Sequence, residues 1–113
     1  MKKQLVTGMI LAFSGAFFVT SANAAVDEAA AKALAKSSDC LKCHAPDKDK
    51  KGPSWKKIAA KYKGKADGED KVVKFMTTSP MVKLDDGKEE KHAAADSKDA
   101  GAVKNLAGWI LSN

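Results

Sequence analysis

Two thiols and an imidazole lie close together near the middle of the chain. Cys40 and Cys43 are separated by two residues, and His44 follows directly. At this spacing each thiol can add to one of two neighbouring vinyl groups on a porphyrin edge, and the short tether presses the histidine against the iron. The pattern is that of c-type haem attachment, with the histidine as proximal ligand and the opposite axial position left to set reactivity. Because the motif occurs once, we expect one haem c per chain.

Three other interpretations of the cysteines fit the sequence less well. A structural zinc site needs four ligands, and His92 is the only cysteine or histidine beyond the motif. A redox dithiol of the thioredoxin type occurs near βαβ alternation, which this chain does not show. A simple disulfide between Cys40 and Cys43 would leave His44 without a role. The motif therefore favours covalent haem.

The first 24 residues have the layout of a secretory signal peptide. Lys2 and Lys3 form a positive flank, an apolar run covers residues 9–19, and Ala22-Asn23-Ala24 supplies small residues for cleavage. The apolar run is too short for a permanent membrane span, so a retained anchor is the weaker alternative. We expect cleavage after Ala24, export to the periplasm, and one mature domain of residues 25–113. Bacterial haem attachment to thiols takes place in that compartment.

The mature chain is small and rich in lysine. Without its leader it has 89 residues, with 18 lysines against 14 acidic residues and no arginine. A domain of this size is marginally stable unless a disulfide, metal or cofactor supports it. Nucleic-acid recognition favours the arginine fork, so we expect no nucleic-acid partner. Scattered lysines suit steering towards an acidic protein, and equally suit solubility. We expect a monomer.

Hydrophobic periodicity predicts an all-α domain of about four helices. Strand signals are nearly absent. The apolar faces include residues at helical spacing in the second, third and last helices: Trp55, Ile58, Ala59 and Tyr62; Val72, Phe75 and Met76; Val103, Leu106, Ala107 and Ile110. The expected helices begin after Asp27, at Trp55 (ending at Gly64), after Asp67, and at Asp96 or Ser97.

Over nearly the whole mature sequence the chain resembles class I cytochrome c. The resemblance rests on the haem motif, on Gly52-Pro53, and on Leu-Ala-Gly-Trp-Ile-Leu at residues 106–111. It implies the cytochrome c fold, a hydrogen bond from His44 to the Pro53 carbonyl, and Trp55 near the haem edge. Such a bond fixes the imidazole and raises its basicity. The resemblance also implies that Trp109 packs on the first helix, where Gly108 would permit a close backbone approach.

The sixth iron ligand is where the sequence departs from the family pattern, which places a methionine in the loop before the last helix. Met76 falls on the apolar face of the third helix and suits the core. Met81 follows Ser-Pro but lies 28 residues before Trp109, whereas His92 lies 17 residues before it. The shorter spacing matches the short bacterial members. We expect His92 as the distal ligand, with Met81 as the alternative.

The resemblance implies a one-electron carrier that serves redox partner proteins and is not an enzyme. A lysine-rich haem edge formed by Lys42, Lys50, Lys51 and Lys56 would suit an acidic partner. The other function class is binding or sensing of a small gas, or weak peroxidase chemistry, which needs a vacant or displaceable distal position. The sequence shows no distal acid–base set, which favours the carrier.

Overall fold

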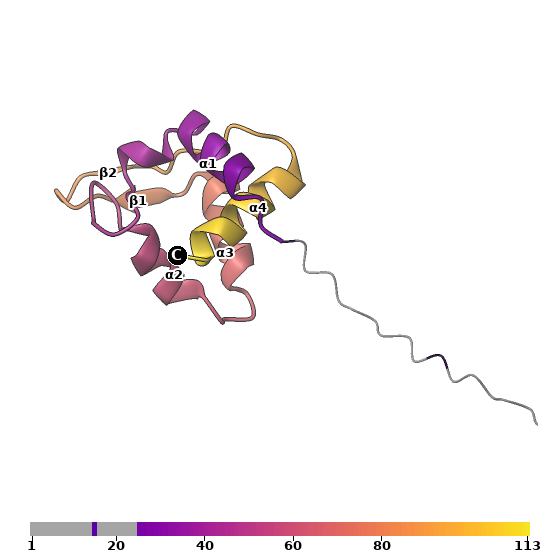
Figure 1. Cartoon of the computed structure of the whole chain (residues 1–113). Helices are drawn as coiled ribbons and strands as arrows, with labels where there is room; N and C mark the ends of the chain where they lie inside the picture. Colours follow the sequence, from indigo (N-terminus) through magenta and orange to yellow (C-terminus); the bar gives the residue numbers. More distant parts are fainter. Residues whose placement is uncertain (1–14, 16–24) are drawn as a thin grey trace, which may run out of the picture.

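The computed structural model describes residue 15 and residues 25–113, and the expected signal peptide therefore lies, apart from Gly15, outside the described residues. No helix within the described part is long and apolar enough to cross a membrane. Figure 1 shows helices packed around one core, with a small hairpin at one side. In chain order the elements are α1 (Glu28–Ser37), η1 (Cys40–Lys42), α2 (Trp55–Tyr62), α3 (Gly68–Thr78), β1 (Met81–Lys83), β2 (Glu89–Lys91) and α4 (Ala100–Leu111).

The first two helices begin where the sequence predicted. Asp27 caps α1 by accepting the Ala30 N–H at 3.0 Å, and Ser54 caps α2 by accepting the Lys57 N–H at 3.1 Å. Each cap satisfies one of the N–H groups that a helix start leaves without an intrahelical partner. The all-α prediction is confirmed, with the three-residue strands β1 and β2 as an addition.

The start of α4 differs from the prediction. Asp99 is its N-cap and accepts the N–H groups of Gly101 at 2.9 Å and Ala102 at 3.4 Å. Asp96, one of the two predicted starts, instead donates its backbone N–H to the hydroxyl of Ser38 at 2.8 Å. Ser38 is buried at the end of α1, so this bond ties the loop before α4 to α1, and the helix begins at Ala100, three or four residues after the predicted starts.

The core lies where α4 crosses the other helices. Helix α4 contacts α1, α2 and α3, and its residues Leu106 and Ala107 are fully buried. Ala31 and Ala35 of α1 are each 1% exposed. Because their side chains are small, α1 and α4 can lie close together. Gly108 does not serve the close backbone approach that was expected of it. A Cβ at this position would meet the side chain of Val26 at 3.2 Å but no neighbouring backbone within 4 Å.

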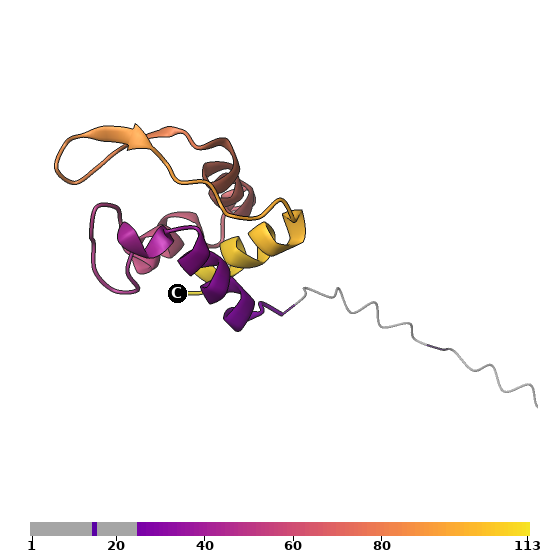
Figure 2. The same ribbon diagram turned by 90° about the horizontal axis from the view of Figure 1, so that it is seen from above.

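A short antiparallel hairpin follows α3. Met81 pairs with Lys91 and Lys83 with Glu89, and Gly87 in the turn takes a φ of +84°, which glycine adopts without strain. The Asp85 N–H donates to the Lys51 carbonyl at 3.2 Å and ties the hairpin to the loop before α2. Figure 2 shows the hairpin extending over the same end of the molecule as the segment that carries η1. The two segments thus face each other.

Candidate functional site

The haem motif lies on one tight turn after α1. Asp39 adopts a left-handed backbone with φ 59°, a conformation that aspartate tolerates better than most residues. The chain then forms η1, and the N–H groups of Cys43 and His44 both donate to the Cys40 carbonyl, at 3.2 and 3.0 Å. Both thiols and the imidazole therefore come from a single turn.

The His44 imidazole is held by the segment before α2. Its Nδ1 lies 2.5 Å from the Pro53 carbonyl oxygen. A carbonyl can only accept, so Nδ1 carries the proton and Nε2 keeps its lone pair for a metal ion. Burial lowers the pKa of His44 from its ordinary value, and the bond to Pro53 opposes this in part. The hydrogen bond that the resemblance implied is present.

Close packing fixes the plane of this imidazole. Trp55 stacks on the ring with centroids 4.6 Å apart and an interplanar angle of 25°. On another side, a Cβ added to Gly52 would lie 2.9 Å from His44 Cε1. The backbone N–H of Trp55 also donates to the Ala45 carbonyl at 2.9 Å, which holds the residue after His44 against the start of α2. The ring is thus confined from several directions.

His92 lies directly after β2 and faces His44. Its backbone N–H donates to the Pro80 carbonyl at 2.8 Å, and its Nδ1 lies 2.9 Å from the Ala93 carbonyl oxygen. By the same argument Nδ1 is the donor and Nε2 is left for a metal. The centroids of the His44 and His92 rings are 6.2 Å apart. Two imidazoles bound to opposite sides of one metal, with bonds of about 2.0 Å and a ring radius of about 1.1 Å, give about this separation.

Met81, the alternative distal ligand, lies outside the cleft, whereas Met76 belongs to the core and reaches it. Met81 is 58% exposed on β1 and does not line the cleft described below. Met76 is 5% exposed and belongs to the core, as the sequence predicted, and it also lines the cleft. Phe75, expected in the core, is 37% exposed, and its ring contacts His92 edge-on at 5.9 Å. This contact was not predicted from the sequence, because it depends on the hairpin that brings His92 back towards α3.

A cleft of about 400 Å³ separates the turn of the haem motif from the hairpin. One wall carries Cys40, Cys43 and His44, and the opposite wall includes Val82, Leu84 and His92. Its lining is mostly apolar, as in pockets for organic cofactors. Trp55, another lining residue, has a buried Nε1 with no hydrogen-bond partner among the described residues. Two thiols, two free Nε2 atoms, apolar walls and an unused donor fit a haem c.

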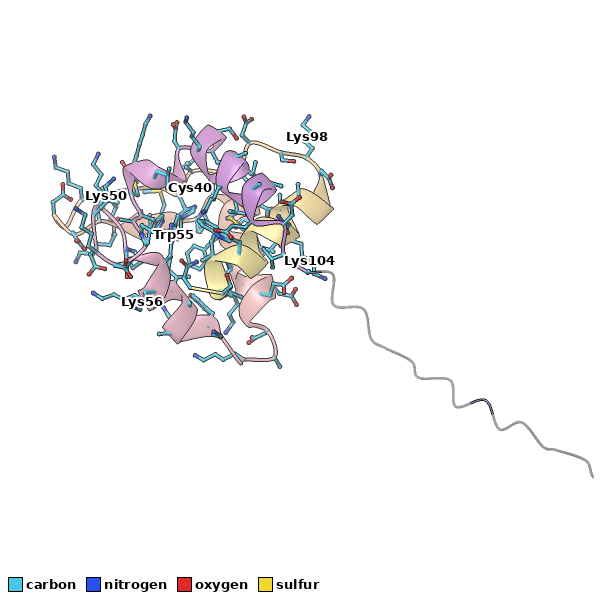
Figure 3. All side chains as sticks on the ribbon, viewed as in Figure 1. Cys40, Lys50, Trp55, Lys56, Lys98 and Lys104 are labelled. Atoms are coloured by element: carbon cyan, nitrogen blue, oxygen red, sulfur yellow. The ribbon has the colours of Figure 1, made fainter. Side chains whose placement is uncertain are left out.

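Lysines border this cleft, but only one of the four predicted ones does. Lys51 lines it. Lys42 pairs with Asp39, Lys50 donates to the Leu41 carbonyl, and Lys56 pairs with Asp47. Figure 3 shows Lys56 pointing away from the body of the molecule and Trp55 lying within it. The other lysines of the lining are Lys57, Lys61, Lys83 and Lys91, which sequence spacing alone did not single out.

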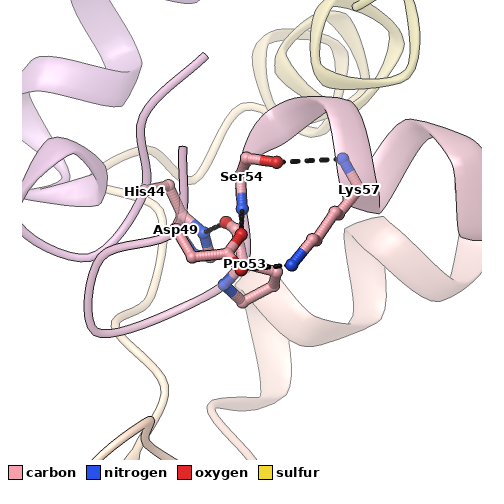
Figure 4. A network of polar contacts seen from close by, with 5 residues as sticks. All are labelled: His44, Asp49, Pro53, Ser54 and Lys57. Carbon is pink, nitrogen blue, oxygen red and sulfur yellow. Dashed lines mark hydrogen bonds and ion pairs between the residues drawn. The ribbon is translucent and has the colours of Figure 1, made fainter. Parts of the chain in front are cut away.

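A polar network next to His44 was also missed. The Asp49 carboxylate accepts the Ser54 backbone N–H at 3.0 Å and pairs with the Lys57 ammonium. Figure 4 shows this network beside the His44–Pro53 hydrogen bond. The pairing lowers the pKa of Asp49 and raises that of Lys57. In the sequence, the only signal was an acidic residue four positions before the expected Pro53 acceptor.

Comparison with known proteins gives one consistent family. The family described as "Cytochrome c" matches residues 28–113. Cytochrome c2 of Rhodocyclus tenuis is 35% identical over 81 residues, which are 71% of this chain and 88% of that protein.

Two solved structures are similar to this chain in both fold and sequence. The class 1 cytochrome MtoD of Sideroxydans lithotrophicus ES-1 is 50% identical, with a TM-score of 0.74, over 78% of this chain and 97% of that one. Cytochrome c552 of Nitrosomonas europaea is 28% identical, with a TM-score of 0.55, over 72% and 96%. The chain therefore belongs to the cytochrome c family, as a class I c-type cytochrome with one covalently attached haem c.

Proposed function

We propose that this cytochrome is a periplasmic electron carrier whose iron is held by His44 on the proximal side and His92 on the distal side. The observation that carries the ligand assignment is the facing pair of imidazoles with centroids 6.2 Å apart. Each ring uses Nδ1 on a backbone carbonyl, which leaves both Nε2 atoms free. Carbonyl partners of this kind orient metal-ligating histidines and set their tautomer.

Two imidazole ligands suit electron transfer better than ligand binding. Haem c, when bound, supplies a one-electron iron couple whose potential depends on the axial ligands. Imidazole nitrogen is a better donor to ferric iron than a thioether, so a His/His pair favours a lower potential than His/Met. With both axial positions filled by protein, an external gas or peroxide has no open position. The proposal is therefore a carrier rather than an enzyme or a gas sensor.

The rest of the chain would insulate the cofactor and guide its partner. The hairpin wall carries the apolar side chains of Val82 and Leu84, which would keep water away from one side of the cofactor. Five lysines line the cleft against two acidic residues, Asp39 and Glu90. This surplus of positive charge would steer an acidic redox protein towards the cleft, an effect that salt weakens.

The proposed location rests on the leader sequence. Residues 1–24 have the order of a signal peptide, and cleavage after Ala24 would release a monomeric domain of residues 25–113. Intact-mass measurement of the haem-loaded protein from the periplasm tests this. A mature chain that begins at Ala25 is expected, and a mass that retains residues 1–24 would contradict the proposal.

Paired substitutions test the distal ligand. We expect His92→Ala to lose the six-coordinate low-spin spectrum and to bind carbon monoxide readily when reduced, because the distal position opens. Met81→Ala is the matched control, since Met81 is an exposed side chain on the same hairpin, and it should leave the spectrum unchanged. The opposite pattern would establish a His/Met carrier. Rapid carbon monoxide binding by the unaltered reduced protein would instead establish a displaceable distal ligand.

A further inference from the structure

We propose that Asp49 tunes the proximal ligand of the haem by acting through the peptide group between Pro53 and Ser54. Asp49 does not bond the imidazole's Nδ1 and does not itself line the cleft, although its ion-pair partner Lys57 does, so it is a positioning residue rather than an iron ligand. The proposal rests on His44 as a ligand to iron and is independent of which residue binds on the distal side.

A single peptide group connects the carboxylate to the imidazole. Its C=O belongs to Pro53 and accepts the His44 Nδ1–H at 2.5 Å. Its N–H belongs to Ser54 and donates to Asp49 Oδ1 at 3.0 Å. Figure 4 shows the two hydrogen bonds on either side of this group. The carboxylate, the peptide and the imidazole thus form one chain of hydrogen bonds.

A charge at one end of such a chain polarises the other end, because the electrons of a peptide group are delocalised over N, C and O. A carboxylate that accepts from the N–H draws the N–H proton towards itself and leaves more negative charge on the carbonyl oxygen. Hydrogen bonds in a chain strengthen one another in this way, and charged acceptors do so most. A stronger acceptor at Pro53 makes the His44 ring more basic, and a more basic ligand stabilises ferric iron. Asp49 therefore lowers the reduction potential from one peptide away.

Lys57 opposes this effect. Its ammonium pairs with the second oxygen of Asp49, Oδ2, and so withdraws charge from the carboxylate that polarises the peptide. Its backbone N–H is bound to the Ser54 hydroxyl as part of the α2 cap, so removing only the ammonium leaves this backbone bond in place. Loss of the ammonium should strengthen the pull of Asp49 on the Ser54 N–H and lower the potential.

A neighbouring ion pair provides the control. Asp47 lies two residues before Asp49, and Lys56 lies one residue before Lys57. Asp47 and Lys56 form an ion pair at 3.5 Å, with side chains that are 80% and 72% exposed. Neither side chain bonds the Pro53–Ser54 peptide group. Removing charge from this pair makes the same change of charge in the same loop and helix without touching the chain of hydrogen bonds, although these side chains are more exposed than those of the first pair.

The experiment compares four variants of the full haem-loaded protein: Asp49→Asn, Lys57→Met, Asp47→Asn and Lys56→Met. The midpoint potential is measured for each, together with the NMR resonance of the His44 ring N–H in the ferrous protein. Asparagine keeps an oxygen that can accept the Ser54 N–H, so Asp49→Asn removes charge while the bond can remain.

We expect Asp49→Asn to raise the ferrous-to-ferric ratio at a fixed potential at least threefold, about 28 mV at 59 mV per tenfold, and to move the N–H resonance upfield. Lys57→Met should shift both quantities in the opposite direction. The two control variants should leave the resonance unchanged and shift the potential less. Equal shifts for Asp49→Asn and Asp47→Asn, with an unmoved resonance, would overturn the proposal.

A purely structural role gives a different pattern. Loosening of the loop by either Asp49→Asn or Lys57→Met would weaken the His44–Pro53 bond in both, so both resonances would move upfield. That result would also overturn the proposal. The resonance reports the His44 ring and all four substitutions lie on the proximal side, so methionine in place of His92 as distal ligand would change the starting potential but neither the expected signs nor the controls.

Discussion

Gly52 lies so close to His44 that adding a single methyl group there should disturb the proximal imidazole. A methyl group added there would lie 2.9 Å from His44 Cε1 and 3.3 Å from both His44 Nδ1 and the Cys43 carbonyl oxygen. The ring cannot move aside freely, because it is bound to Pro53 and stacked on Trp55. Gly52→Ala must therefore displace the imidazole or the loop by about half an ångström to restore ordinary contact distances.

The size of the effect follows from overpacking. Forcing an extra methyl into a closely packed site costs about 1–3 kcal/mol. In a domain of 60–100 residues each kcal/mol shifts the melting temperature by about 4–8 °C, so the haem-loaded variant should melt about 5–20 °C lower. The displaced ring should also weaken the bond to Pro53, which changes the midpoint potential.

Thermal unfolding of the haem-loaded protein, followed by circular dichroism, measures this loss. Gly108→Ala is the matched control, because its new methyl would meet only Val26 Cγ2 at 3.2 Å. Val26 is 40% exposed before α1 and can turn away, while alanine gains up to about 1 kcal/mol over glycine inside a helix. The control should melt at the same temperature or higher. A Gly52→Ala protein as stable as the unaltered one, with an unchanged potential, would refute this reasoning.

Three further outcomes are expected. Without haem, the double variant Cys40→Ala/Cys43→Ala should show much reduced helix by circular dichroism, because the small core is built around the cofactor; native-like cooperative melting would contradict this. Leu106→Ala should lower the free energy of unfolding by about 2–5 kcal/mol in denaturant titration, since Leu106 is fully buried, and a loss below about 1 kcal/mol would mean that the core closes over the gap. Stability of the haem-loaded protein should fall as pH drops below about 6.5, because an iron-bound His44 must stay unprotonated in the folded state whereas a released imidazole in the unfolded chain takes up a proton. A flat profile in urea unfolding at several pH values would show that this ring does not contribute.

Much of the fold could be predicted because its signals are local. Asp27 and Ser54 have side chains that cap a helix within three residues, and the apolar spacing of α2 and α4 marks their buried faces. The start of α4 could not be settled in this way. Asp96, Ser97 and Asp99 are all good capping residues, and the choice depends on the bond between the Asp96 N–H and Ser38, 58 residues earlier.

The hairpin was missed because its strands carry little β signal. Glu89, Glu90 and Lys91 are poor strand formers, and both strands are only three residues long. The one available sign was the Asp86-Gly87 turn, a common hairpin signal, and Gly87 does adopt a positive φ. The attachment residues were predictable from spacing alone, whereas the lysines that border the cleft depend on how the loop and hairpin fold together.

The distal ligand is the central claim, and near-infrared magnetic circular dichroism of the ferric protein at neutral pH tests it most directly. The energy of the charge-transfer band of low-spin ferric haem depends on the pair of axial ligands. The facing rings of His44 and His92 predict a band at the energy of bis-imidazole coordination. A band at the energy of imidazole–thioether coordination would contradict this and transfer the distal position to a methionine.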